Sequence, residues 1–107
     1  MTTVAALEKL LAAGHDNALL RFGLGNAHLD AGDAAQALPH LQRCVEFDPN
    51  YSAAWKLLGK AQTMLGDQDA ARTAWQQGLD AARRHGDKQA EKEMTVFLAR
   101  LERQRPH

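Results

Sequence analysis

Leu24-Gly25-Asn26-Ala27 is followed 34 residues later by Leu58-Gly59-Lys60-Ala61, which keeps its leucine, glycine and alanine. At the same offset Gly32-Asp33 returns as Gly66-Asp67. Three further pairs share this spacing: Ala37 with Ala71, Gln42 with Gln76, and Leu41 with another large apolar residue, Trp75. So many matches in one register indicate an internal repeat, and a period of about 20–50 residues is typical of proteins that stack small structural units.

Each repeat has the pattern of a helix, a tight turn and a second helix, because apolar residues recur at helical spacing on both sides of the Gly-Asp pair. The glycine can take the left-handed conformation that ends a helix, and the aspartate can cap the next one. Gln36 would complete a capping box with Asp33, and Gly86-Asp87 is a third pair of this kind. The predicted helices run from Asp16 or Asn17 to Gly32, from Asp33 to Asp48-Pro49-Asn50, from about Tyr51 to Leu65, and from about Gln68 to His85.

Two further helices flank the repeats. Residues 3–13 carry Leu7, Leu10 and Leu11 on one face, which falls on the buried stripe of a repeat's second helix when it is shifted by one period. Residues 88–104 have the one-sided apolar pattern of a cap. In this terminal helix the stripe is Ala90, Met94, Phe97, Leu98 and Leu101, and the opposite face holds Lys92, Glu93, Arg100 and Arg103. We therefore expect one domain over 1–107, made of a helix at 3–13, repeats at 18–51 and 52–85, and a capping helix at 88–104.

Pro39 is the one residue that conflicts with this pattern. A proline inside a helix removes one hydrogen bond and bends the axis. Because Pro39 lies about two turns after the cap at Asp33, we expect the helix to persist with a local distortion.

The composition favours a globular protein with no strong field of its own. Of the 107 residues 45% are hydrophobic, and 13 basic residues balance 13 acidic ones, which disfavours nucleic-acid and membrane-surface binding. The balance hides an asymmetry, since residues 1–50 carry three basic and six acidic groups while residues 51–107 carry ten and seven. No apolar run approaches the roughly 20 residues of a membrane span, and the start lacks a signal-peptide pattern, so we expect a cytoplasmic location.

The period and the residues within it resemble the tetratricopeptide repeat family. The matching residues are Leu24, Gly25, Ala37, Leu41 and Pro49 in the first repeat, and Trp55, Leu58, Gly59, Ala71 and Trp75 in the second. The chain departs from the family pattern at Arg21, where tryptophan is usual, at His28 and Gln62, where tyrosine is usual, and at Arg83, which replaces a proline. The resemblance covers about residues 18–85 and implies an all-α right-handed superhelix of antiparallel helix pairs, with about six helices.

The resemblance also implies a concave wall that binds peptide segments and is built from the first helix of each repeat. Carried over to this chain, the wall consists of Leu19, Phe22, Asn26, Leu29 and Asp30 from the first repeat, Ala53, Lys56, Lys60, Thr63 and Met64 from the second, and Glu91 and Thr95 from the terminal helix. Phe22 and Leu29 lie off the stripe that packs within their repeat, so a partner or the neighbouring helix must cover them.

The side chains of this wall indicate what it could bind. Asn26 offers a donor and an acceptor that match an extended peptide backbone, and Lys56 and Lys60 share a helix face and could together hold a carboxylate. We therefore expect a protein or peptide partner with an apolar segment and a nearby acidic group, and a chain that acts as a non-enzymatic adaptor or scaffold. The alternative interpretation is that the two lysines are only solvated and that Phe22 packs internally.

Other functions of the repeat remain open alternatives. Two full repeats between half-repeats leave faces that a second copy could cover, although we expect a monomer rather than a homodimer. A helical repeat that binds RNA is disfavoured by the neutral charge and the few aromatic residues. A subclass of the family clamps a C-terminal carboxylate, but here Asn26 fits that clamp while Phe22 and Leu57 do not.

No set of residues indicates an enzyme, a metal site or a cofactor. His40 and Cys44 are four residues apart, but two ligands make a weak metal site, and the pair lacks the third group that nucleophilic catalysis needs. Gly23-Leu24-Gly25 has His28 where a dinucleotide-binding loop needs its third glycine, and no strand precedes it. We expect Cys44 to be a buried packing residue and His28 a part-buried one.

Overall fold

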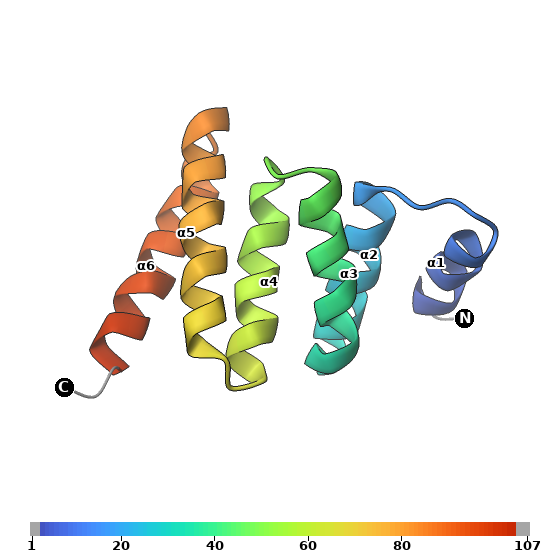
Figure 1. Cartoon of the computed structure of the whole chain (residues 1–107), viewed down its shortest axis with the longest axis horizontal. Helices are drawn as coiled ribbons and strands as arrows, with labels where there is room; N and C mark the ends of the chain where they lie inside the picture. Colours follow the sequence, from blue (N-terminus) through green and yellow to red (C-terminus); the bar gives the residue numbers. More distant parts are fainter. Residues whose placement is uncertain (1–2, 105–107) are drawn as a thin grey trace.

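The computed structural model describes residues 3–104, and within them the chain forms six α-helices and no strand (Figure 1). The helices are α1 (Thr3–Ala12), α2 (Ala18–Asp30), α3 (Ala34–Phe47), α4 (Ser52–Met64), α5 (Gln68–His85) and α6 (Lys88–Gln104). They follow one another along the molecule in chain order, with α1 and α6 at opposite ends. The prediction of an all-α helical repeat is confirmed, with α2/α3 and α4/α5 as the two repeated helix pairs.

The Gly-Asp pairs end one helix and begin the next, as the sequence predicts. Gly32, Gly66 and Gly86 have φ angles of +79°, +85° and +70°, the left-handed conformation that favours glycine. The carboxylate of Asp33 accepts the Gln36 N–H at 3.1 Å, and Asp67 caps α5 in the same way.

One detail of the predicted capping box is wrong. The Asp33 N–H donates to the carbonyl of His28 at 2.8 Å, so it is not available to the Gln36 side chain. The Gln36 amide instead donates to the Asp33 carboxylate at 3.0 Å.

Asp87 places α6 against the second repeat. Its carboxylate accepts the Ala90 N–H at 3.1 Å and the Ser52 hydroxyl at 2.8 Å, so one side chain caps α6 and ties it to the start of α4. The bond from the Ala90 N–H and then the bond from Ser52 lower the pKa of Asp87. The position of α6 is thereby fixed at its first turn.

Two glycines let the paired helices approach closely. A Cβ atom at Gly25 would lie 2.5 Å from Cδ2 of Leu41, and a Cβ atom at Gly59 would overlap the Trp75 indole ring. These are the residues that repeat at 34, so both helix pairs use one packing device. The buried residues form two clusters, one among α2–α5 and one between α5 and α6, and half-buried Trp55 packs against both.

Pro39 does not interrupt α3, which runs from Ala34 to Phe47 without a break. The proline has no N–H to donate, so the carbonyl of Ala35 loses its ordinary helical donor. The expected helix is confirmed, and the distortion expected at Pro39 does not end it.

The N-terminal helix is attached to the rest of the molecule through α2. Among the described helices α1 contacts α2 and no other, and its Leu7 packs beside Gly23. Leu10 remains 46% exposed because no helix covers the outer side of α1. In Figure 1 this helix stands apart at the end of the row.

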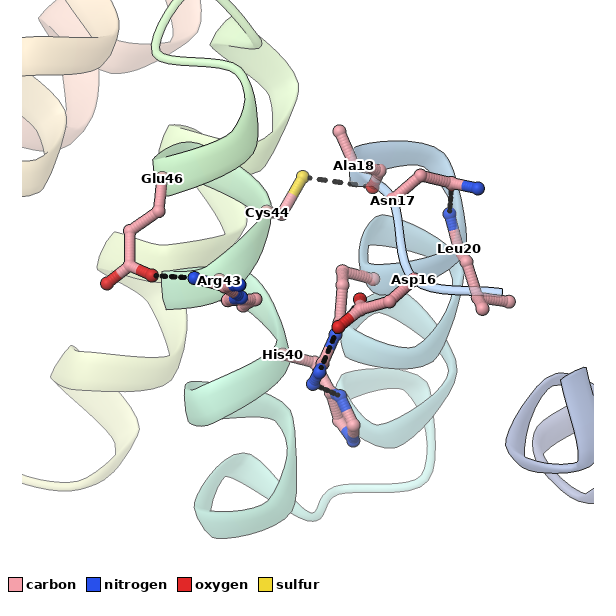
Figure 2. A network of polar contacts seen from close by, with 9 residues as sticks. Asp16, Asn17, Ala18, Leu20, His40, Arg43, Cys44 and Glu46 are labelled. Carbon is pink, nitrogen blue, oxygen red and sulfur yellow. Dashed lines mark hydrogen bonds and ion pairs between the residues drawn. The ribbon is translucent and has the colours of Figure 1, made fainter. Parts of the chain in front are cut away.

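Arg21, which stands where tryptophan is usual in the resembling family, replaces aromatic packing with a polar network (Figure 2). Its guanidinium donates two hydrogen bonds to Asp16, at 2.7 and 2.9 Å, and lies 3.1 Å from Nδ1 of His40 on α3. The bond from Arg21 is the main reason why the pKa of Asp16 is lowered. Because Asp16 is occupied in this way, the α2 cap is Asn17, whose side chain accepts the Leu20 N–H at 2.9 Å.

This network makes the protein less stable in mild acid. Burial, the Arg21 guanidinium and His28 lower the pKa of His40 below its ordinary 6.5, so the unfolded chain binds the proton more tightly than the folded one. The contribution to stability is therefore complete above about pH 6.5 and is lost as the pH falls from there through the folded pKa. We expect urea unfolding from pH 8 to pH 5 to give a falling free energy for the wild type and a flatter profile for His40→Gln. Equal slopes for the two proteins would contradict this assignment.

Candidate functional site

The first helices of successive units, α2, α4 and α6, form one continuous face. Helix α4 contacts α2 on one side and α6 on the other. The link to α6 includes a salt bridge from Lys56 Nζ to Glu93 at 3.0 Å, and the Lys60 ammonium lies 5.4 Å from the centre of the Phe97 ring. We call this surface the α2–α4–α6 face, and it carries the residues that the sequence assigned to a peptide-binding wall.

The α2 part of the face has an exposed polar row beside a half-buried apolar one. Leu19 is 74% exposed, and Asn26 and Asp30 are also exposed. Phe22 and Leu29 are half-buried and pack against the first core cluster. Phe22 stacks on the Tyr51 ring with centroids 4.8 Å apart, so the neighbouring unit covers it in part, as one of the two interpretations required.

The α4 part of the face contains the two lysines in different situations. Lys56 is half-buried and already bound by Glu93, so a ligand carboxylate would have to compete for it. Lys60 is exposed and meets the face of Phe97 rather than a carboxylate. Thr63 donates its hydroxyl to the Gly59 carbonyl at 2.9 Å, and Met64 is 56% exposed.

A cavity of about 290 Å³ opens between the C-terminal halves of α4 and α6. Its lining is mainly apolar, with two cations and two uncharged polar groups: Lys60, Thr63, Met64, Trp75, Phe97, Arg100, Leu101 and Gln104. The Trp75 ring is fixed beneath α4, because its Nε1–H donates to the Lys56 carbonyl at 3.0 Å and its plane lies against Phe97, 5.1 Å away.

Sequence reasoning placed Lys60, Thr63 and Met64 on this surface but missed the α6 half of the cavity. Phe97 was assigned to the packed stripe of α6 and Arg100 to the opposite face. Phe97 lies 34 residues after Thr63, so extending the repeat register into the terminal helix would have brought it to the wall. Glu91 and Thr95, which were assigned to the wall, serve local structure: Glu91 pairs with Arg83 at 3.1 Å, and Thr95 donates to the Glu91 carbonyl.

The residues that resemble chemical sites lie apart from this face and serve packing. Burial raises the pKa of the Cys44 thiol to about 11, and the thiol donates to the Ala18 carbonyl at 3.2 Å (Figure 2). His28 is 6% exposed and stacks on His40 with ring centres 5.7 Å apart. The packing roles predicted for Cys44 and His28 are confirmed. Within residues 3–104 no group of three or more histidine, cysteine, aspartate or glutamate side chains is arranged to hold a metal ion.

Helix pairs stacked in chain order, each closed by a glycine under a large side chain, define a helical-repeat protein. A sequence model of the tetratricopeptide repeat family matches residues 28–91, more than half of the chain. The chain therefore belongs to the tetratricopeptide repeat family, whose domains are in general protein–protein interaction modules.

Similar proteins span nearly the same length. The chain is 68% identical over 102 residues to the TPR repeat-containing protein PA0015 of Pseudomonas aeruginosa, and the match covers 95% of this chain and 97% of that protein. The solution structure of protein BPP2914 from Bordetella parapertussis has a TM-score of 0.82 and 48% identity, over 96% of this chain and 90% of that one. A tetratricopeptide repeat domain protein of Salinibacter ruber has a TM-score of 0.78 and 28% identity, over 84% and 100%.

None of the helices in the described part of the chain combines the length and the apolar content needed to cross a lipid bilayer.

Proposed function

We propose that the chain is a non-enzymatic interaction module that binds a peptide segment along the α2–α4–α6 face and acts as an adaptor or scaffold. The bound segment is apolar and carries a nearby acidic group. The observation that carries this proposal is that large apolar side chains, Leu19 and Met64, stand in solvent on the same face as Asn26 and Lys60. Apolar groups set among fixed polar ones are typical of a recognition surface.

Each part of the face has a role in this proposal. Asn26 can donate to and accept from the backbone of an extended segment. Leu19 and Met64 gain from being covered, since burying a side chain of this size is worth about 1.5–3 kcal/mol. Lys60 attracts a carboxylate, whereas Lys56 is held by Glu93 and contributes only when the ligand displaces that glutamate.

A displayed library of random peptides tests the proposal. The chain should select peptides, and the Leu19→Ser/Asn26→Ala variant should bind a selected peptide about tenfold or more weakly, because it loses one apolar contact and one hydrogen bond. Gln42→Ala/Gln76→Ala, at exposed positions of α3 and α5, is the matched control and should bind like the wild type. Selection of no peptide, or equal loss in both variants, would overturn the proposal.

Self-association is the second candidate, because Leu10 on α1 is 46% exposed at an end of the helix row that no other described helix covers. Light scattering over a range of concentrations distinguishes the two candidates. A mass that stays at one chain removes self-association, and a dimer that Leu10→Ser dissociates supports it.

A further inference from the structure

The strongest unassigned feature is the cavity between α4 and α6, where two cations flank an apolar floor. Trp75, Phe97 and Leu101 supply that floor, and Met64 stands exposed beside it. At about 290 Å³ the cavity is at the lower end of the range for small-molecule sites, about 300–1,000 Å³, so it suits one bulky side chain with its immediate neighbours.

The charges at the cavity differ from those along the rest of the α6 seam. Elsewhere the basic side chains that face α6 are neutralised by its acids: Lys56 by Glu93 at 3.0 Å, Arg72 by Glu102 at 3.4 Å, and Arg83 by Glu91 at 3.1 Å. Lys60 and Arg100, by contrast, have no carboxylate of residues 3–104 within ion-pair distance. The cavity mouth is therefore the place on this seam where positive charge is left for a ligand.

The two cations are held where a ligand would need them. Lys60 is drawn over the face of Phe97, which keeps its ammonium at the cavity. Arg100 follows Phe97 by three residues and so lies one helical turn along the same side of α6. The spacing sets two donors around one apolar opening.

We propose that this cavity is the anchor site for an internal peptide segment that inserts one bulky apolar side chain against Trp75 and Phe97. An Asp or Glu side chain one or two residues away bonds to Lys60 and Arg100. This inference rests on the proposed function and deepens it, because it places the acidic contact on Lys60 with Arg100 rather than on Lys60 with Lys56. A single carboxylate can accept bonds from both cations.

The test uses a peptide selected from the displayed library, made with a blocked N-terminus and an amidated C-terminus so that its only carboxylates are side chains. We expect the selected sequences to share a bulky apolar residue within two positions of Asp or Glu. Replacing that acid by its amide should weaken binding to the wild type about tenfold. Lys60→Gln and Arg100→Gln should each weaken binding of the acidic peptide about fivefold to tenfold and leave binding of the amide peptide unchanged.

Lys92→Gln, at an exposed position of the same helix outside the cavity, is the matched control and should bind both peptides like the wild type. Circular dichroism verifies that every variant remains helical. In an NMR titration the Trp75 indole N–H signal should move when the acidic peptide is added.

The outcomes separate this inference from the proposed function. Peptides that bind with normal affinity to Lys60→Gln and Arg100→Gln, yet lose affinity for Leu19→Ser/Asn26→Ala, would overturn the anchor site and leave the proposed function standing. Selected peptides that bind only when their C-terminal carboxylate is free would likewise overturn the anchor site alone. A library from which no peptide is selected would overturn both.

Discussion

Trp75→Ala is expected to lower the free energy of unfolding by about 3–5 kcal/mol, the range for removing a large buried aromatic side chain. Trp75 is 5% exposed and joins three helices. It fills the space that Gly59 leaves on α4, donates to the Lys56 carbonyl, and packs against Phe97 of α6. Since small domains are stable by about 5–15 kcal/mol in total, the variant should be close to unfolding at room temperature.

Urea titration followed by circular dichroism measures this loss, and Trp75→Phe divides it into parts. The phenylalanine keeps an aromatic ring but removes the hydrogen bond to Lys56, which leaves a buried carbonyl without its donor and costs about 1–3 kcal/mol. Leu19→Ala, at a side chain that is 74% exposed, serves as the control and should change stability by less than about 0.5 kcal/mol. A loss below about 1 kcal/mol for Trp75→Ala would show that this ring is not a joint of the fold.

Gly59→Ala has the second-largest expected effect, a loss of about 2 kcal/mol. Alanine improves the helical propensity of the position by about 1 kcal/mol, but its methyl group would overlap the Trp75 indole ring. The ring cannot move away freely because its N–H is fixed to the α4 backbone, and overpacking of this kind typically costs about 1–3 kcal/mol beyond any gain.

Gly23→Ala is the matched control, since it is also inside a helix. There the new methyl group would lie 3.1 Å from Cδ1 of Leu7, the end of a flexible side chain that can shift. Thermal unfolding should therefore find Gly23→Ala as stable as the wild type or up to about 1 kcal/mol more stable. Equal melting temperatures for Gly23→Ala and Gly59→Ala would mean that the close approach at Gly59 is not rigid.

The sequence predicted the fold well because its signals are local. A glycine followed by aspartate gives both the left-handed residue that ends one helix and the cap of the next, so the turns at Gly32 and Gly66 were placed correctly. The prediction for Gln36 was wrong because the N–H it needed belongs to a bond with His28, on the other side of the same turn. That competition depends on the geometry of the turn rather than on residue type.

The candidate site was predicted only in part because it depends on how α6 lies against α4. Lys56 and Lys60 share a helix face, and nothing within α4 distinguishes them. The difference comes from α6, which brings Glu93 to Lys56 and Phe97 to Lys60. Arg100 was placed on the solvent side of α6 because the apolar stripe alone describes contact with α5, not the additional contact with α4.

The attachment of α1 to α2 alone has a consequence for how the chain opens. In a solenoid the energy of each element is close to the sum of its own folding and its contacts with its neighbours. Releasing α1 therefore costs one interface and leaves the α2–α6 stack closed, whereas releasing any inner helix breaks two or more. The amide protons of α1 should exchange with solvent through a local opening well below the free energy of global unfolding, so the molecule has a graded rather than an all-or-none edge.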